Sequence, residues 1–287
     1  MAANKVAVVV DSIACIPGDL LERYQIGVIP MNFYANDRVL KDGIDVNPSE
    51  AYQLFLKDPA VFKTSGASPG DCLEIFRKAA REGKDIFCVI LSARLSAIHN
   101  TATTAGQPVM DEFPGSSIVV MDSRTAAAAE GLIALAAARA AETGKTLKEV
   151  TATAEKIRDK VSLIAYMDTI RYIYRSGRIP RIAAVAGSML KIKPVFTFSE
   201  GVPHFIGAVR NKRIGIERLI EGMREKINGK PAHIAVMHVY AEEDAIRLKE
   251  RVNTEFNCAE LWLTEFSPLM GYACGTGTIG LAFYPEG

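Results

Sequence analysis

Three uninterrupted apolar runs in the first half of the chain constrain its fold more than any other feature. They span residues 5–10, 86–91 and 117–121, and small polar residues follow each of them. An apolar run of this length that does not alternate with polar residues is typical of a strand buried on both faces. Helical patterns follow the second and third runs, and residues 27–34 predict one further strand. We therefore predict an α/β fold whose N-terminal part is an open, mostly parallel sheet with flanking helices.

Beyond residue 157 the pattern changes to hairpins mixed with helices. Residues 194–209 predict a β-hairpin with its turn at Glu200-Gly201, and the chain is expected to end in a pair of strands. Helices are expected at residues 182–189, 215–228 and 242–256. We therefore predict two domains, an α/β domain at residues 1–157 and an α+β domain at residues 158–287.

Composition and charge exclude several classes of protein. The formal net charge is +1, so no overall field favours nucleic acid as a partner. The five cysteines include no CxxC pair, which argues against a disulfide framework and a zinc site and favours reduced thiols in the cytoplasm. Met1 is followed almost at once by the first strand, which predicts no signal peptide. The apolar stretch 125–141 contains Glu130 and Arg139, so we expect a packed helix and no membrane crossing.

Hydroxyl side chains gather where the predicted strands end. They are Ser12, Ser92, Ser96 and Ser123 after the three apolar runs, with Thr64, Ser65 and Ser68 before another helix. Ligands bind at the carboxyl edge of open α/β sheets, and helix N-termini favour anions. No acid–base or metal cluster accompanies these hydroxyls in the sequence. The pattern favours a site that holds an anionic head group, and it predicts no catalytic residue, no metal ion and no cofactor.

A glycine motif and the isolated titratable residues fit structural roles better than catalytic ones. Residues 275–280 match GxGxxG, but only seven residues follow them, so we expect a glycine-rich turn between strands. Asp11 and Asp122 at strand ends could act as catalytic carboxylates, although we favour caps that fix the loops. Of the four histidines, His99 is the candidate to retain, because it lies in the turn after Ser96.

Several short motifs, taken in order, resemble those of the DegV family of bacterial fatty-acid-binding proteins. The resemblance covers nearly the whole chain, and six or more motifs in order make it specific. The matching segments are Asp11-Ser12, DGIDV at 42–46, FKTSGASP at 62–69, LSARLS at 91–96, Asp122-Ser123, DTIRYIYRSGRI at 168–179 and MLKIKP at 189–194. The resemblance implies two domains with a long apolar tunnel between them and a fatty acid inside. It also implies that the protein presents acyl chains to a fatty acid kinase.

The same resemblance assigns a head-group site to particular residues. Thr64 and Ser96 would hold the acyl carboxylate, with Ser65 and the backbone amide of Ala97 nearby. Helix N-capping is the alternative role for these hydroxyls, and we favour it for Ser68. The expected ligand is therefore a long-chain fatty acid, held without any other cofactor.

Two departures from the family pattern surround this site. The family's SSxLSGT turn ends here in Ser96-Ala97-Ile98-His99, so its glycine and threonine are absent. The histidine of the C-terminal HxGPG motif is replaced by Ala273. We name His99 as the candidate to take the place of that histidine beside the head group.

The chain is therefore expected to be a cytoplasmic lipid-binding carrier and not an enzyme on its own. One alternative is an enzyme that acts on a small anionic substrate at the same strand ends. Such an enzyme needs a general base beside Ser96 or Thr64, and only His99, Asp11 or Asp122 could serve. A second alternative is a regulatory domain in which the ligand is only a structural plug.

Basic residues cluster between Arg171 and Arg213, where nine of them stand against one acid, Glu200. A solvated face that acids elsewhere balance is one interpretation of this cluster. The other is a docking surface for an acidic kinase domain or an anionic bilayer. Arg210, Lys212 and Arg213 are the expected docking contacts. No aromatic or groove-reading motif accompanies the charge, so nucleic acid is not an expected partner.

Overall fold

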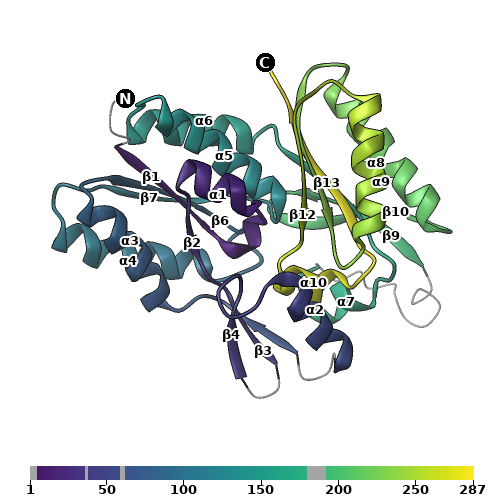
Figure 1. Cartoon of the computed structure of the whole chain (residues 1–287), viewed down its shortest axis with the longest axis horizontal. Coiled ribbons are helices and arrows are strands. Elements are labelled where there is room, and N and C mark those ends of the chain that lie inside the picture. Colours follow the sequence, from purple (N-terminus) through teal and green to yellow (C-terminus); the bar gives the residue numbers. More distant parts are fainter. Residues whose placement is uncertain (1–4, 36–37, 59–61, 180–191) are drawn as a thin grey trace.

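The computed structural model describes residues 5–35, 38–58, 62–179 and 192–287. Two large sheets lie side by side, and a small third sheet projects beneath them (Figure 1). The helix expected at residues 182–189 lies outside the described residues.

The first large sheet is parallel throughout and has the order β2-β1-β6-β7. Its strands are β1 (Val6–Asp11), β2 (Gly27–Ile29), β6 (Asp85–Ile90) and β7 (Ile118–Asp122). The helices around it are α1 (Gly18–Tyr24), α3 (Pro69–Arg81), α4 (Ile98–Glu112), α5 (Ala128–Glu142) and α6 (Leu147–Arg158). Helices α3 and α4 cover one face, while α1, α5 and α6 lie on the other (Figure 1). The predicted open parallel sheet with flanking helices is confirmed.

The prediction of a single strand at residues 27–34 is wrong, because the chain leaves the first sheet at Pro30. Strand β2 ends at Ile29, and the next strand, β3 (Asn32–Ala35), belongs to a separate antiparallel sheet of order β4-β3-β5. Proline has no N–H to donate to a strand ladder, which makes it a natural point for the break. The other elements of this region are β4 (Arg38–Lys41), α2 (Pro48–Lys57) and β5 (Lys63–Ser65).

The second large sheet is mixed and has the order β10-β9-β8-β13-β11-β12. Its strands are β8 (Ser162–Tyr166), β9 (Lys193–Ser199), β10 (Val202–Val209), β11 (Ala232–His238), β12 (Cys258–Glu265) and β13 (Ile279–Pro285). The hairpin predicted at residues 194–209 is confirmed as β9 and β10. Its turn residues Glu200 and Gly201 have φ angles of 50° and 77°, and positive φ at both positions is typical of a type I′ turn.

The last two strands of the chain do not form the expected pair, because β11 lies between β12 and β13. Helix α10 (Pro268–Cys274) carries the chain across, and Gly275 ends that helix with a φ angle of 84°. The glycine segment 275–280 therefore joins a helix to a strand, whereas two strands were expected. A Cβ at Gly275 would lie 2.3 Å from the ring of Tyr172, so only glycine fits there. The remaining helices are α7 (Arg171–Ser176), α8 (Lys212–Ile227) and α9 (Glu242–Glu255).

Helix α5 is packed between the two large sheets. It contacts β1 and β6 on one side and β11 and β13 on the other. Every one of its residues is buried except Arg139 and Glu142, and a helix that is apolar all round is buried all round. In the described part of the chain, no helix combines the length and hydropathy that a membrane crossing requires. Because α5 touches both sheets, the division into domains at residue 157 stays a prediction.

Candidate functional site

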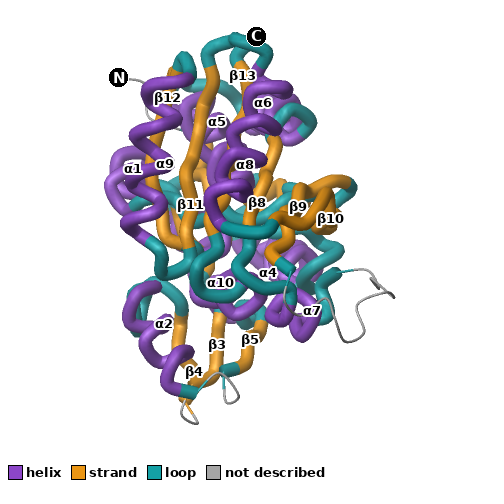
Figure 2. The backbone as a smooth tube through the Cα atoms, turned by 90° about the vertical axis from the view of Figure 1, so that its right-hand side faces the viewer, coloured by secondary structure: helices purple, strands orange, loops and turns teal. Residues whose placement is uncertain are grey.

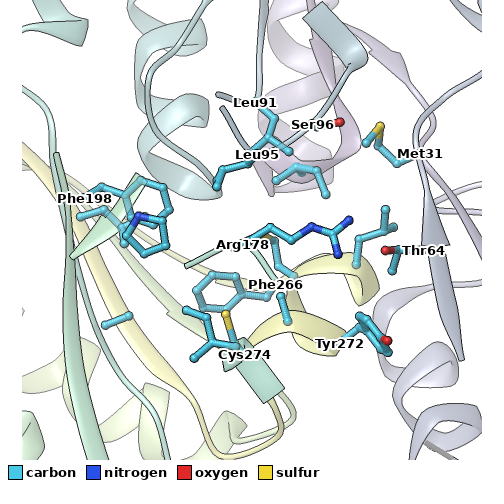
Figure 3. Close-up of a pocket in the computed structure, with 18 of the residues that line it drawn as sticks. Met31, Thr64, Leu91, Leu95, Ser96, Arg178, Phe198, Phe266, Tyr272 and Cys274 are labelled. Carbon is cyan, nitrogen blue, oxygen red and sulfur yellow. The ribbon is translucent and has the colours of Figure 1, made fainter. Parts of the chain in front are cut away.

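A largely apolar cavity of about 280 Å³ lies where the carboxyl ends of β1 and β6 face β5, the second sheet and α10. Its apolar wall includes Leu163, Ala165, Phe196, Phe198 and Phe266. Polar groups gather near Thr64, whereas Phe198 lies at the opposite side of the cavity (Figure 3). The volume is close to the lower end of the range for small-molecule sites, about 300 Å³. An apolar interior with polar groups at one end suits an amphiphilic ligand.

Four of the five predicted head-group residues line this cavity. Thr64 and Ser65 end strand β5, while Ser96 lies in the loop after β6 and Ala97 directly precedes α4. The Ser96 hydroxyl accepts a hydrogen bond from the amide of Ile98 at 3.3 Å. Ala97 provides no side-chain cap for α4, so the Ser96 hydroxyl takes part of that role. The fold therefore brings together residues that stand more than thirty positions apart.

Of the two positions where the sequence departs from the family pattern, Ala273 lines the cavity and His99 does not. Ala273 lines the cavity, as its place in the C-terminal motif implies. His99 is half-buried in the first turn of α4 and is not among the residues that line the cavity. Its role beside the head group stays a prediction.

Arg178 is a residue of the site that the sequence analysis did not single out. It follows the end of α7 at Gly177, whose φ angle of 70° turns the chain. Its side chain lines the cavity and extends toward Thr64 (Figure 3), while Nη1 donates a hydrogen bond to the backbone oxygen of Ser176 at 2.7 Å. A signal was available, because Arg178 lies in the segment DTIRYIYRSGRI at 168–179, one of those that resemble the family's motifs. It places a cation at the polar end of an apolar cavity.

The strand-end carboxylates have the loop-fixing role that we favoured for them. Asp11 accepts hydrogen bonds from the amides of Ile13 at 2.8 Å and Leu91 at 2.9 Å. Asp122 accepts hydrogen bonds from the amides of Ala93 and Arg124. Burial raises the pKa of Asp11 to about 6. No aspartate, glutamate or histidine stands among the described residues that line the cavity, so its polar end offers hydrogen-bond donors and one cation.

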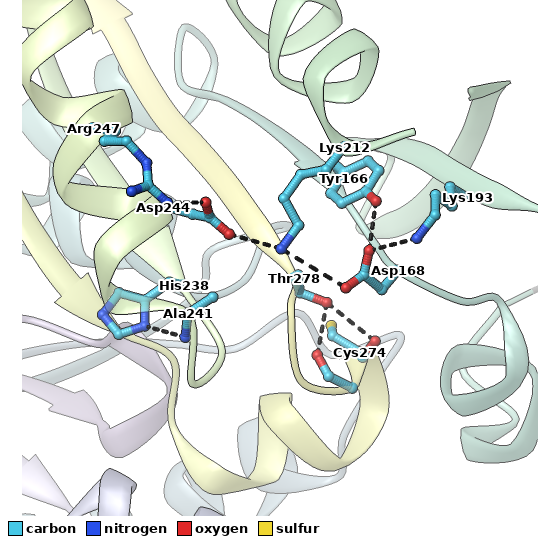
Figure 4. A network of polar contacts seen from close by, with 11 residues as sticks. Tyr166, Asp168, Lys193, Lys212, His238, Ala241, Asp244, Arg247, Cys274 and Thr278 are labelled. Atoms are coloured by element: carbon cyan, nitrogen blue, oxygen red, sulfur yellow. Dashed lines mark hydrogen bonds and ion pairs between the residues drawn. The ribbon is translucent and has the colours of Figure 1, made fainter. Parts of the chain in front are cut away.

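Lys212, one of the three predicted docking residues, is engaged in an ion-pair network within the second half (Figure 4). Its Nζ lies 2.7 Å from Asp244 and 3.8 Å from Asp168. Asp168 also accepts hydrogen bonds from Lys193 at 2.8 Å and from the Tyr166 hydroxyl at 2.5 Å. Burial opposes ionisation of Asp168, but the hydrogen bonds from Lys193 and Tyr166 hold its pKa below the ordinary value. Lys212 therefore contributes less free charge to the surface than the sequence suggested.

Arg210 and Arg213, the other two predicted docking residues, are exposed. Arg210 follows the last residue of β10, and Arg213 lies in the first turn of α8. Within the described ranges, no ion pair of 4 Å or less joins either guanidinium to a carboxylate. Of the three predicted docking residues, Arg210 and Arg213 are thus the two with exposed charge.

Comparison with known proteins identifies the family. The model of a family described as uncharacterised protein, DegV family, matches residues 5–286. A DegV domain-containing protein from Streptomyces coelicolor is 34% identical over 281 residues, which are 97% of this chain and 98% of that protein. A DegV family protein from Thermus thermophilus, described as binding fatty acid, is 26% identical with a TM-score of 0.89 and covers 98% of this chain and 100% of its own. A DegV lipid binding protein from Thermotoga maritima is also 26% identical, with a TM-score of 0.87 over 98% of both chains. The resemblance seen in the sequence is confirmed, and the chain belongs to the DegV family.

Proposed function

We propose that the protein is a carrier that holds a long-chain fatty acid in the apolar cavity. The observation that supports this most is the cavity itself, with an apolar interior and with Thr64, Ser96 and Arg178 at one end. The carboxylate would lie among the two hydroxyls, the amide of Ala97 and the Arg178 guanidinium. The solved relatives from Thermus thermophilus and Thermotoga maritima, described as fatty acid or lipid binding, support the same assignment.

The energetics favour an acyl chain over a small anion. Each buried CH₂ contributes about 0.8 kcal/mol, so a long chain supplies most of the binding free energy. A hydrogen bond to a charged group adds about 1.5–3 kcal/mol, which is enough to set the orientation of the chain. A small anionic substrate would leave the apolar wall formed by Leu163, Phe196 and Phe198 without a contact. The enzyme alternative therefore has less support from this cavity.

We also propose that the carrier works in the cytoplasm and presents the acyl carboxylate to a kinase partner or exchanges the chain with a membrane. A carrier with no base of its own needs a partner for any chemistry on the carboxylate. The exposed Arg210 and Arg213 are the proposed docking contacts, while Lys212, predicted with them, is bound to Asp244 and Asp168 and would add less charge. No nucleic acid partner is proposed, since no aromatic or groove-reading motif accompanies the charge.

The first test is the identity of the molecule that co-purifies with the protein. We expect native mass spectra to show an excess mass of one monocarboxylic lipid, which denaturing spectra release. Because the ligand is held mainly by its chain, washing with salt should leave it bound and organic extraction should remove it. Recovery of only water-soluble metabolites, or of no ligand after incubation with excess fatty acid, would contradict the proposed function.

A second prediction concerns the hydroxyls of the head-group site. Thr64→Val and Ser96→Ala should each weaken fatty acid binding by roughly 1–3 kcal/mol, because a buried carboxylate oxygen loses its donor. Thr103→Val, which changes an exposed threonine of α4, is the matched control and should bind as the parent does. Titration with a fluorescent fatty acid measures all three variants.

His99→Ala belongs in the same titration, because it tests whether His99 compensates for Ala273. A loss similar to that of Ser96→Ala would assign His99 to the head group. If Thr64→Val and Ser96→Ala both bind as tightly as the parent, these hydroxyls are only part of the loop structure.

A further inference from the structure

Strand β10 forms one edge of the second large sheet (Figure 2), and two large apolar side chains of this strand are exposed. It pairs with β9 on one side, and no described strand lies on the other. The side chains of Phe205 and Ile206 are 39% and 54% exposed. Pro203 and an irregularity between Phe205 and Gly207 discourage another strand from pairing with this edge, but the two apolar side chains stay exposed. The two side chains are therefore a candidate contact surface for a partner.

A β-bulge places Ile206 outside the regular ladder. Phe205 pairs with Phe196, but the next register pair joins Gly207 to Val195, so Ile206 is the extra residue. A bulge bends the strand and redirects a side chain. The rings of Phe205 and Phe196 meet edge to face, with centroids 5.8 Å apart, and Phe196 lines the cavity. The exposed apolar pair thus adjoins the wall of the proposed fatty acid site.

Two exposed cations follow this apolar pair in the chain. Arg210 is four residues beyond Ile206, about 13 Å along an extended strand, and Arg213 follows in the first turn of α8. Both are exposed, in contrast to Lys193 and Lys212, which bind Asp168. We call Phe205, Ile206, Arg210 and Arg213 together the β10 edge patch. It combines a short apolar projection with an adjacent positive charge.

We propose that the β10 edge patch docks on an anionic lipid bilayer, with Phe205 and Ile206 entering the interface. This proposal rests on the proposed function, since a carrier of fatty acids needs a surface that contacts their source. A single apolar anchor binds a bilayer only weakly, and an adjoining basic group that meets anionic head groups strengthens the attachment. The patch supplies both kinds of group next to the cavity wall. An acidic protein partner would need only the two arginines. It would give no role to the exposed Ile206 at the bulge.

Vesicle flotation of the full chain tests this proposal. The parent should float with vesicles of phosphatidylglycerol and phosphatidylcholine, and less with pure phosphatidylcholine or at high salt. Ile206→Ser should weaken binding to the anionic vesicles about tenfold, because one large apolar side chain is lost from the interface. Arg210→Glu combined with Arg213→Glu should weaken it at least tenfold on anionic vesicles only. Ile246→Ser, which removes an isoleucine of α9 that is 41% exposed, is the matched control.

The outcomes separate this proposal from the carrier function. If the parent, Ile206→Ser and the double arginine variant all bind vesicles equally well, the proposal is overturned. It is also overturned if the control Ile246→Ser loses as much vesicle binding as Ile206→Ser does. If the variants float normally but fail to support acyl phosphorylation by a kinase, the patch docks a protein and the proposal is also wrong. Fatty acid delivered from cyclodextrin should bind all variants alike. Failure of the parent to bind it would instead contradict the carrier function.

Discussion

Replacing Arg178 by glutamate should remove fatty acid binding almost completely. The parent guanidinium lies at the polar end of the cavity and extends toward Thr64. The variant loses a charged hydrogen-bond donor and sets a second carboxylate against that of the ligand. The lost donor costs about 1.5–3 kcal/mol, and repulsion adds to it, so we expect a total of at least about 3 kcal/mol. This corresponds to more than about a hundredfold in Kd.

Two further variants make the Arg178 experiment specific. Arg178→Lys keeps the positive charge and should recover much of the affinity, although it loses the planar pair of donors. Arg171→Glu makes the same charge change at an exposed position of α7 that does not line the cavity, and it should bind as the parent does. The melting temperature of the lipid-free variants checks that the fold is intact. Equal affinity in Arg178→Glu and Arg171→Glu would show that Arg178 does not contact the ligand.

The parts of this site that the sequence predicts are those governed by local rules. Strands that run parallel end at one edge, so the polar residues after β1, β6 and β7 had to lie near one another. Local capping is equally readable. Ser68 accepts a hydrogen bond from the amide of Asp71 at 3.2 Å, and the Asp71 carboxylate accepts one from the amide of Ser68 at 3.0 Å. Such features depend on a few neighbouring residues and need no knowledge of the remaining chain.

The parts that the sequence does not predict depend on contacts between distant residues. Lys212 is a surface cation by its position at the start of α8, and only the fold brings it to Asp168 and Asp244. Arg178 lies in a recognised motif, but its direction into the cavity follows from the turn at Gly177 and the position of β5. The order of β11, β12 and β13 in the sheet is likewise set by packing, because the residues of each strand do not specify which strand lies next to it.

The contribution of Asp42 to the stability of the protein should fall as the pH rises from about 4 to about 6. Asp42 lies in the loop after β4 and is only 4% exposed. Its carboxylate accepts a hydrogen bond from the Ser267 hydroxyl at 2.5 Å, which ties this loop to the start of α10. Burial raises the pKa of Asp42 from 3.8 to about 6, although hydrogen bonds from Ser267 and Ser12 lower it in part. Burial likewise raises the pKa of the nearby Asp11 to about 6.

The sign of the effect follows from these raised pKa values. In the unfolded chain both carboxyls ionise near pH 3.8, whereas in the folded protein they keep their protons until about pH 6. The stabilisation is fully present below the unfolded pKa and is lost as the pH rises through the folded pKa. A shift of about two pKa units corresponds to about 3 kcal/mol for each group.

Asp42→Asn tests this account, because asparagine keeps an oxygen that accepts the Ser267 hydrogen bond but carries no charge. The variant and the parent should be about equally stable near pH 4, and near pH 7 the variant should be more stable by up to about 3 kcal/mol. The difference between the two curves should therefore grow from about pH 4 to about pH 6, while the pH dependence that both proteins share comes from Asp11 and the other carboxyls with shifted pKa values, such as Glu130 and Asp168. Asp45→Asn changes an exposed carboxylate of the same loop and should follow the parent at every pH. Urea unfolding over this range measures the difference, and parallel curves for Asp42→Asn and the parent would show that Asp42 ionises as freely in the folded protein as in the unfolded chain.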